Sequence, residues 1–133
     1  MIFNLIKPVY AHCDVPCGIY ETDTAKHAAA TCLRMIEKIE ALGEIDSLEK
    51  QANFVRMTST KEVHAQKVKN ELYLLWSDYF KPEHVEQFPD LHTTIWNAVK
   101  QASKVKQTYS KDECQKLIEA VNSVADLFEQ SKK

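Results

Sequence analysis

Two cysteines four positions apart lie near the N-terminus of this 133-residue chain, and they are the residues most suited to chemistry. Cys13 follows directly after His12, and Cys17 follows Pro16. Pro16 and Gly18 favour a bend that would bring the two thiolates together, because proline fixes φ and glycine tolerates unusual backbone angles. Such a pair could bind a metal ion or form a redox-active dithiol. A zinc knuckle would need a second pair of ligands elsewhere in the chain.

The other two cysteines are isolated from this pair and from each other. Cys32 and Cys114 each fall on the apolar face of a helical pattern. Free cysteine packs like a small hydrophobic residue, so we expect both thiols to lie in the core. Four cysteines in a chain of this length are also too few for a disulfide scaffold.

The composition limits the fold classes that could position these cysteines. The chain has only 2 glycines and 4 prolines, with 44% hydrophobic and 27% charged residues. So few glycines disfavour a β-sandwich or barrel and a glycine-rich phosphate loop. A formal charge of −2 gives no nucleic-acid footprint, and the absence of an apolar run of 18 residues argues against a membrane span. The sequence therefore predicts one all-α domain that binds neither nucleic acid nor membrane.

Apolar residues recur at helical spacing in four stretches, about 22–42, 46–79, 90–106 and 110 onward. Gly43 is placed to end the first helix. The second helix is expected to open at Asp46 or Ser47, and Asp46 with Glu49 resembles a capping box. Ser110 with Glu113 is a second such box. Residues 58–60 are a candidate break, and residues 82–89 are expected to form a loop between two prolines. Four amphipathic helices with short connections predict an antiparallel bundle.

The inner faces of these helices can be listed from the spacing. They comprise Ala25, Ala28, Ala29, Cys32, Met35, Ile36 and Ile39 in the first helix, Leu48, Ala52, Val55, Val63, Val68, Leu72, Leu75 and Tyr79 in the second, Leu91, Ile95, Ala98, Val99 and Ala102 in the third, and Leu117, Val121, Val124, Leu127 and Phe128 in the fourth. Trp76 and Trp96 are expected to be core or interface anchors.

The segment HCDVPCGIY at 12–20 resembles the nickel hook of nickel-containing superoxide dismutases, and LLWSDYFKPEHVEQFPDLH at 74–92 is similar to a second segment of that family. The resemblance covers essentially everything after Ala11. It implies an enzyme that disproportionates superoxide to dioxygen and hydrogen peroxide by cycling one nickel ion per subunit between Ni(II) and Ni(III).

The resemblance also implies a ligand set and a maturation step. In that family the mature chain begins at the histidine, so residues 1–11 would be a leader and 12–133 the working domain, with its hook at 12–20. His12 would supply its new amine and its imidazole, Cys13 its thiolate and backbone amide, and Cys17 a second thiolate. These strong donors stabilise Ni(III), and planar nitrogen and sulfur ligation suits Ni(II). Before cleavage, the nitrogen of His12 is a peptide amide and cannot act as an amine donor.

Further residues match positions that support the hook in the family. Tyr20 would order solvent and restrict access at the open face of the metal, and Tyr79 would support Tyr20 through hydrogen bonding; alternatively, both are ordinary packed tyrosines. Asp14 would stabilise the hook, and Pro16 and Gly18 its bend.

One departure from the family lies near the imidazole of His12. Ala28 and His64 occupy the positions where the family often has a glutamate and an arginine that hold this ring. Such partners orient a ligating imidazole and tune its basicity, so the sequence leaves open how His12 is held, and a match displaced by one residue is an alternative. His64 could take this role, or it could lie on a solvated helix face.

The resemblance further implies a homohexamer and a maturation protease as partner. The lack of a persuasive export signal and the need for reduced thiols favour a cytoplasmic location. The alternative hypotheses are a nickel- or zinc-binding protein or a Cys-x-x-x-Cys redox protein without dismutase activity, and a structural bundle with a decayed hook. The histidine directly before Cys13 argues against a simple thiol pair, which has no need of it.

Overall fold

The computed structural model describes residues 19–133. The predicted leader and most of the predicted hook lie outside this range, including His12, Cys13, Asp14, Pro16, Cys17 and Gly18.

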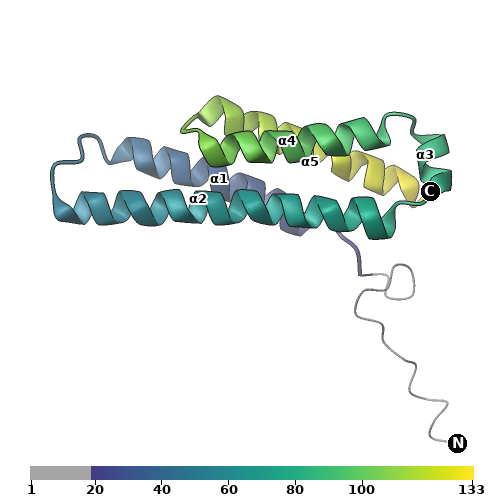
Figure 1. Ribbon diagram of the computed structural model, residues 1–133, viewed down its shortest axis with the longest axis horizontal. Coiled ribbons are helices and arrows are strands. Elements are labelled where there is room, and N and C mark those ends of the chain that lie inside the picture. The colour runs from purple at the N-terminus through teal and green to yellow at the C-terminus, as the bar shows by residue number, and fades with distance from the viewer. Residues whose placement is uncertain (1–18) are drawn as a thin grey trace, which may run out of the picture.

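Long antiparallel helices form a four-helix bundle, which confirms the all-α prediction (Figure 1). The elements in chain order are α1 (Asp23–Ala41), α2 (Leu48–Leu74), the π-helical turn η2 (Leu75–Tyr79), the short α3 (Pro82–Gln87), α4 (Leu91–Gln107) and α5 (Lys111–Ser131). Around the bundle, α1 packs on α2, α2 on α4, α4 on α5, and α5 on α1. The range 19–133 contains no β-strand and no helix long and apolar enough to cross a membrane.

Local sequence explains where most helices begin and end. Gly43 follows α1 with φ of 62°, a left-handed conformation that glycine adopts without steric cost. The Oγ of Ser47 accepts the backbone N–H of Lys50, so Ser47 caps α2 and the predicted Asp46–Glu49 box is wrong. Ser110 caps α5 in the same way.

The second helix departs from α-geometry at its end and not at the predicted break. It runs without interruption through residues 58–60, and the ladder then changes at η2, where the Phe80 N–H donates to the carbonyl of Leu75 at 2.9 Å. Single π-turns within helices are frequent at functional sites. Beyond it, Pro82 is the first residue of α3, so the expected loop contains a helical turn.

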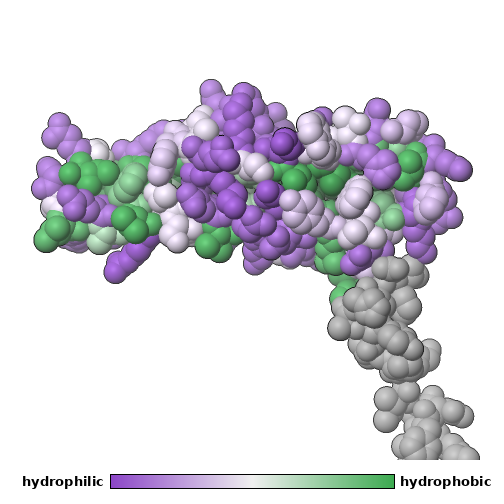
Figure 2. All heavy atoms as spheres, viewed as in Figure 1, coloured by the Kyte–Doolittle hydropathy of each residue, from purple (hydrophilic) through white to green (hydrophobic). Residues whose placement is uncertain are grey.

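The predicted core is confirmed for α4, for α5 and for α1 except Met35, which is only half-buried, whereas in α2 and η2 it is confirmed only from Val68 onward. Leu48, Val55 and Val63 are 84%, 63% and 61% exposed. Figure 1 shows the reason for the first two, because the α1–α2 hairpin extends beyond the turn that joins α4 to α5. Figure 2 shows the resulting apolar surface at that end of the molecule. A fully buried lysine, Lys61, lies on the inner face of α2 instead.

Candidate functional site

The two tyrosines singled out in the sequence lie together at one end of the bundle. Tyr20 precedes α1 and Tyr79 ends η2, and their ring centroids are 5.5 Å apart with planes inclined at 56°. The chain therefore enters the bundle beside η2, two residues after the last glycine of the predicted hook. The fold brings together a tyrosine from each of the two segments that carry the family resemblance.

Aromatic rings surround Tyr79 and fix its position. Its ring centroid lies 4.7 Å from that of Phe128 in α5 and 5.1 Å from that of Phe80. The imidazole of His84 stacks on it at 5.7 Å with an angle of only 11° between the planes. A tyrosine packed by three neighbours and by Tyr20 has little freedom to change rotamer.

The hydroxyl of Tyr79 pairs with Ser131, the last residue of α5, at 2.7 Å. Sequence analysis predicted that Tyr79 supports Tyr20 by hydrogen bonding, whereas between these two residues the structure records a ring contact. Ser131 was not identified from the sequence, because a serine near a C-terminus carries no motif. Only the packing of α5 against η2 places it at the site.

His84 was also not assigned a role at this site from the sequence. Its Nδ1 accepts the backbone N–H of Lys81 at 3.0 Å, which closes the first turn of α3 and orients the ring against Tyr79. Because Nδ1 is an acceptor, the neutral ring carries its proton on Nε2. The proline that starts α3 is the sequence signal that could have located this turn.

The described cysteines are unsuited to binding a metal. Burial is the main reason that the pKa of the Cys32 thiol is raised to about 12 and that of Cys114 to about 11. Both are free and buried, and the Cys32 thiol donates to the carbonyl of Lys61 at 3.5 Å. The ionised thiolate is the metal ligand, so these two groups are held in the wrong state.

Within residues 19–133 there is no cluster of three histidine, cysteine or carboxylate side chains that could hold a metal ion. The ligands that the family resemblance implies, His12, Cys13 and Cys17, lie outside this range. Two thiolates with nitrogen donors are a set that suits planar Ni(II), so the residues of the chain fit nickel.

Ala28 and His64 differ chemically from the glutamate and arginine that the family often has at these positions. Ala28 is buried in α1 and has no polar atom in its side chain. His64 is half-buried in α2, where its Nδ1 lies 2.9 Å from the carbonyl oxygen of Thr60. A carbonyl only accepts, so Nδ1 carries a proton and is engaged within its own helix.

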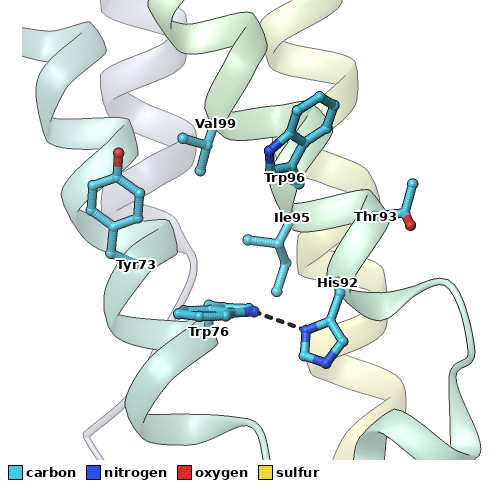
Figure 3. Close-up of a pocket in the computed structure, with 7 residues that line it drawn as sticks. All are labelled: Tyr73, Trp76, His92, Thr93, Ile95, Trp96 and Val99. Carbon is cyan, nitrogen blue, oxygen red and sulfur yellow. Dashed lines mark hydrogen bonds between the residues drawn. The ribbon is translucent and has the colours of Figure 1, made fainter.

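A hollow of about 680 Å³ lies between the α2–η2 segment and α4 (Figure 3). Trp76 is 49% and Trp96 61% exposed, so the prediction that they are core anchors is wrong and only the interface alternative stays open. The indole N–H of Trp76 donates to Nδ1 of His92 at 2.9 Å. The remaining lining residues are Tyr73, Thr93, Ile95 and Val99.

These features define a four-helix-bundle protein with a pair of packed tyrosines, Tyr20 and Tyr79, where the described chain enters the bundle. Residues 7–132 match the family described as nickel-containing superoxide dismutase, and the chain belongs to that family.

Two curated proteins are similar in sequence to the whole of this chain. The nickel superoxide dismutase of Streptomyces seoulensis is 38% identical over 136 residues, which cover 100% of this chain and 99% of that protein. The enzyme of Streptomyces coelicolor is 33% identical over 137 residues with the same coverage. A crystal structure of a nickel-containing superoxide dismutase after partial X-ray-induced reduction superposes with a TM-score of 0.80 at 37% identity, covering 91% of this chain and 98% of the other. A native nickel superoxide dismutase structure gives 0.80 at 33% identity, covering 92% and 100%.

Proposed function

We propose that this protein is a nickel superoxide dismutase, which converts two superoxide anions and two protons into dioxygen and hydrogen peroxide. The observation that carries the proposal is the family match over residues 7–132 in a chain whose histidine and two hook cysteines are all present. The bundle and the contact between Tyr20 and Tyr79 support it, because they are what the family resemblance requires around a hook.

Nickel would be held by the amine and imidazole of His12, the thiolate and amide of Cys13, and the thiolate of Cys17. The bound ion supplies the one-electron change between Ni(II) and Ni(III) that dismutation needs. Tyr20 would order solvent beside this site and limit access to small anions. Tyr79 would hold the ring of Tyr20 in place through the 5.5 Å contact.

Removal of residues 1–11 is part of the proposal, because only a free N-terminus gives His12 an amine. The matched solved chains support a shorter mature form. They align over 98% and 100% of their own length while covering 91% and 92% of this chain. A protease that cleaves after Ala11 would therefore be a partner in maturation.

We further propose a homohexamer in the cytoplasm, with neighbouring subunits holding the hooks. The exposed indoles of Trp76 and Trp96 support subunit contacts, because aromatic side chains are enriched in protein interfaces. A cytoplasmic location would keep the two hook thiols reduced until the metal binds.

The decisive experiment compares the full chain with protein matured by its protease, using intact mass, metal content and dismutase activity. We expect the active form to begin at His12 and to hold about one nickel per subunit. Full activity in a chain that retains Met1 would overturn the amine-ligand mechanism. Cys13→Ser and Cys17→Ser should each abolish nickel binding, and nickel binding without activity in the parent would indicate a carrier protein instead.

A further inference from the structure

The hydroxyl of Ser131 takes part in two short hydrogen bonds. Its Oγ lies 2.6 Å from the carbonyl oxygen of Phe128, one turn earlier in α5, and 2.7 Å from the hydroxyl oxygen of Tyr79 in η2. Both distances lie well within the range of O–H···O bonds, so a proton must lie between each pair of oxygens.

The directions of these two bonds follow from counting protons. A carbonyl oxygen has no proton, so the proton between Ser131 and Phe128 must come from Ser131. A serine hydroxyl has only one proton, which is then used. The proton between Ser131 and Tyr79 must therefore come from Tyr79, and Ser131 accepts it.

With its proton donated to Ser131, the phenol oxygen of Tyr79 can only accept further hydrogen bonds. Its single proton is committed to Ser131, while its phenol oxygen keeps lone-pair capacity for an O–H donor. Within residues 19–133 the Tyr79 hydroxyl has no second hydrogen-bond partner. The hydrogen-bond chain from Tyr79 through Ser131 ends at the backbone carbonyl of Phe128. A carbonyl has no proton, so it cannot reprotonate Tyr79 if Tyr79 gives up its own.

We propose that Ser131 is a positioning residue that sets the direction of the Tyr79 hydroxyl, so that Tyr79 serves as a hydrogen-bond acceptor toward a further donor and not as a proton donor to superoxide. The O–H donor that it receives would be a water molecule. The catalytic part of this inference rests on the proposed dismutase function, whereas the direction of the hydrogen bond does not.

The surrounding packing makes the effect specific to the hydroxyl. The Tyr79 ring is held by Phe128 at 4.7 Å and by His84 at 5.7 Å, so removing the Ser131 oxygen leaves the ring in place. The phenol proton is then free to rotate about the C–O bond away from the position of Ser131. Ser131→Ala thus tests the proton direction without repacking the aromatic cluster.

Ultraviolet resonance Raman spectroscopy on the full chain, with and without nickel, provides the first test. The tyrosine doublet differs in intensity ratio between a phenol that donates a hydrogen bond and one that accepts. Subtracting the spectrum of Tyr79→Phe isolates the signal of Tyr79. We expect a donor signature in the parent and in Ser131→Thr, and a shift toward the acceptor or mixed signature in Ser131→Ala. A parent without the donor signature, or no change in Ser131→Ala, would overturn the proposal.

Dismutase activity across a pH range provides the second test. Ser131→Ala should lower kcat about fivefold, which corresponds to ~1 kcal/mol at about 1.4 kcal/mol per tenfold change, with KM changed less. Ser131→Thr should restore kcat to within about twofold of the parent, a rescue expected of a retained hydroxyl.

Ser123→Ala is the matched control, because the hydroxyl of Ser123 also donates to a carbonyl of α5, at 3.1 Å, but contacts no tyrosine. It should change neither spectrum nor kcat. An inactive parent that still shows the donor signature would refute the dismutase function and leave the assignment of Ser131 intact. Normal kcat in Ser131→Ala with an altered spectrum would refute the catalytic part alone.

Discussion

The ammonium nitrogen of Lys61 lies 2.6 Å from the carbonyl oxygen of Thr108 and donates a hydrogen bond to it. A second bond, of 3.1 Å, goes to the carbonyl of Lys106. These carbonyls close the C-terminal end of α4, where the last backbone acceptors of a helix lack partners and the helix dipole is negative. The ring of Tyr109 covers the ammonium group at 4.5 Å. A buried cation from α2 therefore caps a neighbouring helix.

Lys61→Met should destabilise the fold, because methionine keeps most of the apolar stem but provides no donor for the two carbonyls. We expect a loss of about 1–3 kcal/mol in the free energy of unfolding, the usual cost of unsatisfied buried polar groups. Urea denaturation at one fixed protein concentration measures it. Lys67→Met on the exposed side of the same helix is the control and should stay within about 0.5 kcal/mol of the parent. Equal stability of the two variants would contradict the capping role.

Glu113 should make the stability of the bundle depend on acid pH. The hydrogen bond from Gln101 at 2.7 Å, followed by the contact with Lys104 at 3.1 Å, lowers the pKa of this carboxyl from 4.5 to about 2. A group with a lowered folded pKa stabilises the protein above its unfolded pKa. That contribution is lost as the pH falls from about 4.5 toward 2.

The urea midpoint of the parent should therefore fall more steeply between pH 5 and about 2 than that of Glu113→Gln, which cannot titrate. Glu119→Gln, at an exposed position of the same helix, should follow the parent curve. Parallel curves for Glu113→Gln and the parent would show that the ion pairs around Glu113 do not act on stability.

The four cysteines should separate into two functional groups. Cys32→Ala and Cys114→Ala are expected to keep nickel and to lose roughly 1–2 kcal/mol each of stability from small core cavities. Cys13→Ser and Cys17→Ser should lose nickel. Metal analysis with urea denaturation distinguishes the two groups, and loss of nickel in Cys32→Ala at unchanged helicity would refute the division.

The native core thiols should also resist thiol reagents at neutral pH. Burial raises the pKa of Cys32 to about 12 and of Cys114 to about 11, so little thiolate is present. A Cys13→Ser, Cys17→Ser double variant isolates these two groups. Its thiols should react with a disulfide reagent only after unfolding, and fast reaction in the folded state would contradict their burial.

Tyr20→Phe and Tyr20→Ala should have different effects, because only the first keeps a ring against Tyr79. Tyr20→Ala is expected to lose about 1 kcal/mol of stability with the ring contact. It should also be inhibited more strongly by azide and larger anions, since the ring would restrict access to the metal. Unfolding free energies and azide inhibition of the nickel-loaded forms measure both effects. Equal azide inhibition of parent and Tyr20→Ala would rule out a gating role for the ring.

The number of long helices, their approximate ends and the class of the protein follow from the sequence by itself. Helical spacing, the glycine after α1 and the serine before α5 are local signals, because a helix is built from contacts within a few residues. The hook segment at 12–20 was likewise predicted from local sequence, by its resemblance to the family motif, since its histidine, cysteines, proline and glycine lie close together in the chain.

Tertiary structure decided which of the remaining residues matter. Leu48 and Val55 follow the helical pattern but are exposed, because the α4–α5 hairpin is too short to cover them. Lys61 breaks the pattern but is buried, because the end of α4 meets it with two carbonyls. Ser131 meets Tyr79 only through the packing of α5 against η2. In each case the partner lies on another helix, and periodicity within one helix contains no information about the length or the exposed backbone groups of its neighbours.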